Sequence, residues 1–510
     1  MSEKDQFPSS PGDDGNSESW LIENSPQIKA KIETECDETG LSDRISQLPD
    51  ALIIQILSRL SITDVFRTTI LSKHWQYFWT SIDNLVYDNE EFSRSDSSMV
   101  HKFISLTDNV LPLLSNSSIK KCSLNFVFKH ENDVSYFLVI DKWLEFAVNK
   151  KVEGLCLNIS YDIDAIEHDQ PYSLPEVLCS SSSILKLKCQ NCRILDDCIL
   201  NWTSMKSLTL EGLLIRDEHI KQIMSNCPQL ESFNLFGFCG LKLIDHYHPI
   251  GDWYSFEGDC CFEVVAPYVE HLTISGDFDY TEIELKDLSS LDHAKLCLCS
   301  DEFDSMDEDI LIDLLVSIRC ANELILSSCL SRLVISIWMM DLELNFSLSL
   351  LECRWLTISS YISKVSFPML DKLLRSTPNL ENLMIFPGIE DHSIFQDAEE
   401  YTEALELYDL LSFEENIFKV SLQNLKNVKV MPFCSGTRTS DATELDQFLK
   451  FLLEHAINLE KMVIVPKHKG CNSCSINSSQ LMKCLLLFPR TSISAVISLG
   501  PITQNVFDTL

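Results

Sequence analysis

A short apolar motif recurs along most of the chain, with leucine or a similar residue at its first, fourth and sixth positions. Two copies are closely alike, Asn226-Cys-Pro-Gln-Leu230-Glu-Ser-Phe233 and Ser376-Thr-Pro-Asn-Leu380-Glu-Asn-Leu383. In each copy we expect a helix to end before the proline, and a strand to begin at the leucine. This repetition constrains the fold more than any other feature, because one such strand cannot bury its apolar face alone.

The repeated unit, a strand followed by a helix or loop, has the leucine-rich-repeat signature. Stacked copies form a parallel sheet that lines a curved solenoid. The predicted fold class is therefore α/β, with leucine-rich repeats over residues 89–415, and terminal repeats and a C-terminal cap over 416–510. The expected strands lie within 152–158, 184–189, 205–210, 230–235, 269–274, 294–298, 324–326, 355–358, 380–385, 428–430 and 459–464.

The charge of the chain excludes some partners. Its 510 residues include 76 acidic and 40 basic ones, a formal net charge of −36. Nucleic-acid binding depends on Lys and Arg that displace counterions from phosphate, so we expect neither nucleic acid nor a membrane as a partner. The most apolar stretch, 333–351, carries Asp341 and Glu343, which argues against a membrane span. Residues 1–42 hold ten acidic residues and three lysines among few apolar ones, which predicts a disordered acidic tail.

The 20 cysteines make up about 4% of the chain, too few for a disulfide scaffold. The first residues also lack the basic and apolar regions of a secretory signal. We therefore expect reduced cysteines and a location in the cytoplasm and/or nucleus. Of two CxxC pairs, Cys189/Cys192 follows a repeat strand and is expected to be structural. Cys471/Cys474 is expected in a polar loop, with a metal or redox role as the less favoured alternative.

Residues 43–88 have a different pattern, which predicts three short helices. The first begins at Pro49 and carries apolar residues at offsets that place them on one helical face. Thr63 is the expected N-cap of the second helix, and Ser72 that of the third. So small a unit needs a partner or a neighbouring domain to bury its apolar faces. These apolar residues are Leu52, Ile53, Ile56, Leu57 and Leu60 in the first helix and Trp75, Phe78 and Trp79 in the third.

The same segment closely resembles the F-box motif in the form seen in plant F-box proteins. The resemblance rests on the order and spacing of Asp43-Arg44-Ile45-Ser46, Leu48-Pro49-Asp50, Ile56-Leu57-Ser58, Leu60, Asp64, Arg67-Thr68, Leu71-Ser72-Lys73, Trp75 and Trp79. It continues over residues 101–128, which look like the first linker and strand after a plant F-box. Residues 422–462 resemble, in part, the FBD region that closes many such proteins. The whole chain looks like a plant F-box/leucine-rich-repeat protein.

This resemblance implies a function. In that family the F-box binds a Skp-class adaptor of a cullin–RING ubiquitin ligase, and the repeats capture the protein to be ubiquitinated. The resemblance implies a non-catalytic subunit without a cofactor, and the sequence contains no GxSxG, GxxxxGK[ST] or HExxH motif. It does not name the substrate or the residues that bind it. Carried over by motif position, the adaptor face comprises Leu48, Pro49, Ile53, Ile56, Leu57, Leu60, Leu71 and Trp75.

Two other functions remain open. Some F-box/leucine-rich-repeat proteins sense hormones in a pocket on the concave sheet, which would require buried basic anchors for an acidic ligand. The predicted strands are expected to carry few basic residues at inward positions, so this function ranks lower. A scaffold that never joins a ligase is the third possibility.

Three surface segments are candidates for substrate contact, although ordinary solvated loops are the more frequent meaning of such patterns. They are the acidic run 301–309, the insert at 390–415, and the aromatic insert His246, Tyr247, His248, Trp253 and Tyr254. The acidic segments would favour a basic substrate.

Leu57 and Pro49 are the strongest candidates for adaptor contact. We expect Leu57→Arg to abolish copurification of the adaptor, because the substitution places an unpaired charge on an apolar face. Copurification at the wild-type level would contradict the assignment of Leu57.

Overall fold

A computed structural model describes the N-terminal helical unit and most repeat strands. The described residues are 45, 47–88, 109–112, 114, 119–128, 135–161, 171–213, 215–237, 260–277, 281–299, 308–327, 351–360, 370, 373–374, 376–387, 422–433, 439–466 and 482–500. The predicted acidic tail, the acidic run 301–309 up to Asp307, the inserts at 246–254 and 390–415, and Cys471/Cys474 lie outside them.

One parallel sheet of 14 strands runs through the molecule. Its order is the chain order except that β7 and β9 are left out. The strands are β1 (Asn84–Asp88), β2 (Lys121–Phe128), β3 (Gly154–Tyr161), β4 (Lys186–Gln190), β5 (Ser207–Glu211), β6 (Ser232–Phe236), β8 (His271–Asp277), β10 (His293–Cys299), β11 (Glu323–Ser327), β12 (Trp355–Ser360), β13 (Asn382–Pro387), β14 (Asn427–Phe433), β15 (Lys461–Pro466) and β16 (Val496–Leu499). The α/β solenoid with its eleven predicted strands is confirmed.

The period-2 pattern of each strand explains how the sheet is buried. Leu208 and Leu210 of β5 are fully buried, whereas Ser207, Thr209 and Glu211 are not. Neighbouring strands repeat this alternation in register, as in Leu187↔Leu208 and Cys189↔Leu210 between β4 and β5. The buried positions therefore form continuous rows across the sheet, and the alternate positions form rows on its opposite face.

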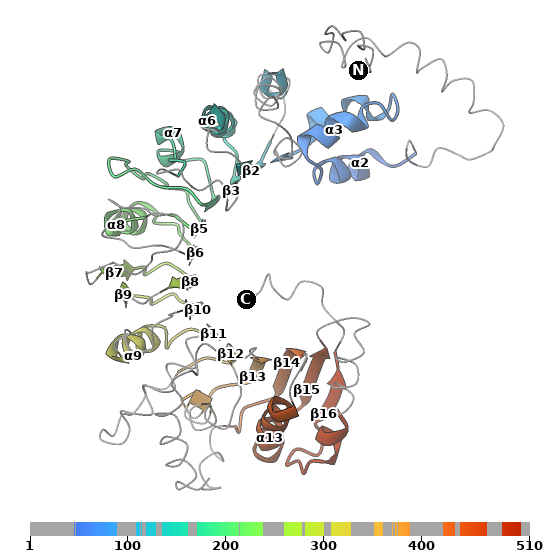
Figure 1. The fold of residues 1–510 in the computed structure, drawn as a ribbon, viewed down its shortest axis with the longest axis vertical. Helices are drawn as coiled ribbons and strands as arrows, with labels where there is room; N and C mark the ends of the chain where they lie inside the picture. The colour runs from blue at the N-terminus through green and yellow to red at the C-terminus, as the bar shows by residue number, and fades with distance from the viewer. Residues whose placement is uncertain are drawn as a thin grey trace, which may run out of the picture.

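The sheet curves into an arc, and helices cover its outer side (Figure 1). Strands β2 to β11 line the inner side of this arc in Figure 1. Helices of the described repeats include α6 (Ser135–Asn149), α7 (Glu176–Cys179), α8 (Asp217–Asn226), α9 (Glu308–Ser317) and α13 (Thr439–His455). Because the buried rows face the helices, the half-buried and exposed rows line the concave face.

Two strands that the sequence did not predict replace helices in the outer layer. β7 (Cys260–Val265) pairs in parallel with β9 (Thr281–Lys286) as a separate two-stranded sheet. This pair lies between α8 and α9 on the outer side of the arc (Figure 1). As a result β6 pairs directly with β8, and β8 with β10.

The N-terminal unit consists of α2 (Asp50–Leu57), α3 (Ile62–Thr68) and the 3-10 helix η1 (Trp75–Ser81). It joins the edge of the large sheet at β1. Ser61 forms a parallel bridge with Val86, and the Asn84 side-chain amide donates to the Ser58 carbonyl oxygen at 2.6 Å. Ile53, Leu57, Ile62 and Val65 belong to the same buried cluster as the repeat leucines. The neighbouring domain thus supplies apolar surface that so small a unit lacks.

Left-handed residues end three consecutive strands. Asn191, Gly212 and Gly237 follow β4, β5 and β6 with φ of 54°, 60° and 51°. At each turn the backbone amide donates to a carbonyl at the end of the next strand, as Gly212 does to Phe236 at 2.8 Å. A Cβ at Gly212 would also collide with Asn191 Oδ1. Glycine is therefore required at position 212 by both its backbone conformation and its neighbour.

We expect Gly212→Ala to lower the free energy of unfolding by about 1–3 kcal/mol, because a left-handed non-glycine residue is strained. Urea denaturation measures this change. Gly154→Ala is the matched control, since its Cβ would meet only Lys121 Cγ at 3.5 Å and glycine inside a strand is itself destabilising. Equal stability of the two variants would contradict the strain at Gly212.

Candidate docking surface on the N-terminal helices

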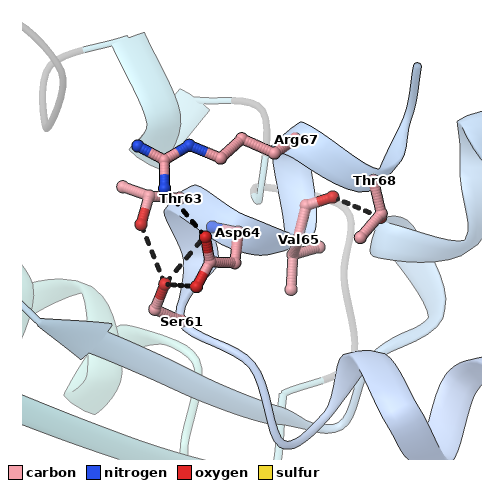
Figure 2. Close-up of polar contacts among 6 residues, drawn as sticks. All are labelled: Ser61, Thr63, Asp64, Val65, Arg67 and Thr68. Atoms are coloured by element: carbon pink, nitrogen blue, oxygen red, sulfur yellow. Dashed lines mark hydrogen bonds and ion pairs between the residues drawn. The ribbon is translucent and has the colours of Figure 1, made fainter. Parts of the chain in front are cut away.

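The start of α3 is fixed by Ser61, which is its N-cap (Figure 2). The Asp64 backbone N–H donates to Ser61 Oγ at 3.2 Å, and the two side chains also bond to each other. The prediction that Thr63 is the N-cap was wrong: Thr63 lies inside the helix, and its hydroxyl bonds to Ser61 Oγ at 2.8 Å. The spacing Ser61-x-x-Asp64 was the signal that would have identified the cap.

An ion pair and the helix dipole also act on Asp64 in the first turn of α3. Arg67 donates to Asp64 Oδ1 at 2.9 Å across one turn of the helix, as Figure 2 shows. Both side chains are largely exposed, so this ion pair adds little stability. Asp64 near the helix N-terminus interacts favourably with the helix dipole.

Two contacts bring the beginning of the unit against η1. The Asp50 carboxylate lies 3.3 Å from His74 Nε2. The Trp75 indole N–H donates to the Ile45 carbonyl oxygen at 3.4 Å. The prediction that Ser72 is the N-cap was wrong, because His74 holds that position and makes no side-chain cap bond. Ser72 Oγ accepts from the Trp75 backbone amide at 3.4 Å. Residues 45–56 and 71–77 are therefore neighbours in space.

The eight predicted adaptor residues fall into three groups. Ile53, Leu57 and Trp75 are buried in the core of the protein itself. Leu48 and Leu60 are partly buried against that core. Pro49, Ile56 and Leu71 are exposed, the last two at 41% and 54%. The role of these eight residues in adaptor binding stays a prediction, and only the third group is open to a partner in this structure.

Four further apolar side chains of this unit are exposed, and the sequence reasoning missed them as contacts. They are Ile45, Leu52, Ile70 and Tyr77. For Leu52, the missed signal was which side of α2 each apolar residue occupies. Leu52 and Ile56 are four residues apart on one side, and Ile53 and Leu57 are four apart on another. The broad apolar face predicted for this helix is thus divided between core and solvent.

Because Leu57 lies on the core side of α2, the Leu57→Arg variant tests more than adaptor binding. Leu57 is 1% exposed, so an arginine there would bury an unpaired charge and disturb the fold of the unit. Loss of adaptor copurification by this variant would report on folding as well as on docking.

Buried thiols account for the first CxxC pair. Cys189 and Cys192 are both buried and are free cysteines, and desolvation raises the pKa of each thiol. Desolvation likewise raises the pKa of Cys122 to about 12. Such thiols are inert, because the thiolate is the reactive form. No group of His, Cys, Asp and Glu within the described ranges is arranged to hold a metal ion.

The concave face carries more basic residues than the sequence reasoning supposed. Alternate, inward positions of the strands hold six lysines, so that expectation was wrong. None of the six is buried, and Lys188 forms an ion pair with Glu211 at 3.1 Å. The six residues are Lys121, Lys186, Lys188, Lys295, Lys429 and Lys461.

Comparison with known proteins gives the class of the two parts. Residues 45–87 match the F-box domain model, and residues 110–244 match the model described as At1g61320/AtMIF1, LRR domain. The helical unit and the repeats thus define an F-box protein with a leucine-rich-repeat domain. In that part of the chain for which coordinates are described, no helix is both long and apolar enough to cross a membrane.

Relatives of similar organisation occur in Arabidopsis thaliana. Putative F-box/LRR-repeat protein At5g02930 is 23% identical over 360 residues, covering 68% of this chain and 72% of the relative. F-box/LRR-repeat protein At5g02910 is 24% identical over 438 residues, covering 83% and 88%. Putative F-box/LRR-repeat protein At4g15060 is 30% identical over 219 residues, covering 42% and 48%. The two matched domains and these relatives support a plant F-box/leucine-rich-repeat protein.

Proteins of this class are generally non-catalytic and typically act as substrate receptors of SCF-type ubiquitin ligases, in which the F-box associates with a Skp-class adaptor. The exposed apolar side chains of residues 45–77 lie within the segment that matches the F-box model.

Removal of the Ser61 hydroxyl tests the assigned cap. We expect Ser61→Ala to destabilise α3 by about 1 kcal/mol, since one backbone amide loses its acceptor. Faster hydrogen–deuterium exchange over residues 62–68 measures this. Thr63→Ala is the control and leaves that amide bonded; faster exchange in Thr63→Ala than in Ser61→Ala would contradict the assignment.

Proposed function

We propose that this chain is the substrate-recognition subunit of an SCF-type (Skp–cullin–F-box) ubiquitin ligase. The observation that carries the proposal is the exposure of Ile45, Leu52, Ile56, Ile70, Leu71 and Tyr77 within one small helical unit. Large apolar side chains gathered at a surface are typical of a protein interface. The Skp-class adaptor is the proposed partner, through which the cullin–RING ligase is reached.

The exposed residues refine the proposed adaptor face. Pro49, Ile56 and Leu71 are the predicted contacts that a partner can reach without unfolding the unit. Ile53, Leu57 and Trp75 support this face from below as part of the core. Leu48 and Leu60 lie between these two groups.

The proposed division of labour follows the order of the domains. Residues 43–88 dock the adaptor, residues 89–415 form the repeats that bind a protein substrate, and residues 416–510 close the chain with terminal repeats, an FBD-like region and a cap. The ligase then acts by proximity, because a held substrate has a raised effective concentration near the activated ubiquitin. The chain itself needs no catalytic residue or cofactor, and its proposed location is the cytoplasm and/or nucleus.

A hormone-type co-receptor is less well supported. A pocket for a small acid needs buried polar anchors. The inward lysines of the described strands are exposed or half-buried, so they suit contact with a large partner better than enclosure of a small one.

A charged substitution at an exposed position of the docking face tests adaptor binding without disturbing the fold. We expect Ile56→Glu and Leu71→Glu each to weaken adaptor binding at least about tenfold, roughly 1.4 kcal/mol, because a desolvated carboxylate is left without a partner. Pull-down with a purified Skp-class adaptor, followed by calorimetry, measures the affinity.

Leu138→Glu is the matched control, since Leu138 is an exposed leucine on α6 in the repeats. Its adaptor affinity should equal that of the wild type, and the melting temperatures of all variants should agree. Wild-type affinity of both Ile56→Glu and Leu71→Glu would refute the proposed docking face.

A further inference from the structure

Two imidazoles, a carboxylate and an indole lie in one row across the concave face. The register pairs His271 of β8 with His293 of β10, His293 with Glu323 of β11, and Glu323 with Trp355 of β12. Adjacent strands are about 4.8 Å apart, so these side chains are direct neighbours. The row exists because β7 and β9 lie in the outer layer and leave β8 beside β10.

His293 holds Glu323 in place. Its Nδ1 lies 2.8 Å from Glu323 Oε2, and its Nε2 lies 3.0 Å from Asp292 Oδ2. The His271 ring stacks on the His293 ring, with centroids 4.4 Å apart and planes 18° apart. A side chain fixed in this way loses less conformational entropy when it binds a partner. The second oxygen of the half-buried Glu323 carboxylate keeps acceptor capacity for such a partner.

Trp355 is the unusual member of the row. It is the first residue of β12 and is 47% exposed, although the next three residues, Leu356, Thr357 and Ile358, are buried. An exposed indole on a rigid strand offers a large flat surface with little rotamer entropy to lose. Tryptophan is also among the residues enriched at the energetic centres of protein interfaces.

A carboxylate of the row supplies an acceptor for a cationic group. Glu323 and Asp292 lie in or beside the row, both in contact with His293, and Lys295 lies two residues beyond His293 on β10. Arg354, the residue before Trp355, helps to lower the pKa of the Glu381 carboxyl, after the larger effect of Lys426, and so interacts with Glu381. The chain as a whole has a net charge of −36, which attracts a basic partner over a longer range.

We propose that the row formed by His293, Glu323 and Trp355 binds an arginine side chain of a basic segment in a protein partner. The planar guanidinium stacks on the Trp355 indole and donates to the Glu323 carboxylate on the neighbouring strand. Arginine fits better than lysine, because it alone combines a flat stacking face with a fork of N–H donors. This inference rests on the proposed function only where the partner is called a substrate of the ligase.

A binding assay with defined peptides tests the site directly. Fluorescein-labelled peptides of alternating serine with arginine, lysine, glutamine or glutamate are titrated with the purified full chain, and fluorescence polarisation gives the affinities. We expect the arginine peptide to bind more tightly than the lysine peptide, and the glutamine and glutamate peptides to bind weakest. The assay contains no adaptor, so its failure leaves the proposed docking face untouched.

Substitutions locate the binding. We expect Trp355→Leu and Glu323→Gln each to lower the affinity for the arginine peptide about threefold or more. The matched controls are Tyr268→Leu, an exposed aromatic between β7 and β8, and Glu145→Gln, an exposed carboxylate on α6. Both controls should bind as the wild type does. Because Trp355 is half exposed and Glu323 is changed isosterically, melting temperatures should stay within a few degrees of the wild type.

Several results would overturn the inference. Equal affinities of Trp355→Leu, Glu323→Gln and the wild type would show that the row does not bind arginine. Equal losses in the site variants and the controls would assign the binding to the general negative charge of the chain. Tighter binding of the glutamate peptide would assign the concave face to an acidic partner through its lysines.

Discussion

The register of parallel strands is the constraint on which the rest of this protein depends. Each strand from β1 to β15 has one buried side, and together these strands form buried rows across the sheet. Backbone hydrogen bonds fix the register, and the buried leucines, isoleucines and valines keep one face turned towards the outer layer. The concave face, the strand-end turns at Asn191 and Gly212, and the attachment of the F-box all follow from this arrangement.

Much of the fold was predictable because the repeat is a local pattern. The alternation in segments such as Leu230-Glu-Ser-Phe233-Asn-Leu235 determines the type of each element and its buried face. The replacement of helices by β7 and β9 was not predictable, since it depends on what packs against the outer side. The row of His271, His293, Glu323 and Trp355 was hidden for the same reason, because it requires knowledge of which strands are neighbours.

The F-box shows the limit of pattern reasoning at a docking site. The motif identified the unit and its helices, but it could not divide α2 between core and surface. Ile53 and Leu57 are buried, whereas Leu52 and Ile56 are exposed to solvent. A difference of one position in a helix corresponds to about 100° of rotation, which decides whether a substitution tests binding or folding.

The attachment of the F-box to β1 has a geometric consequence. Because the helical unit bonds to the first strand and shares its core, it cannot swing freely on a linker. Each added strand displaces a point on the concave face by about 4.8 Å. Trp355 lies nine strands beyond β1 in the sheet order, roughly 40 Å along the curved surface. Under the proposed function, the strand on which a substrate is held would set which of its lysines come within reach of the transfer machinery.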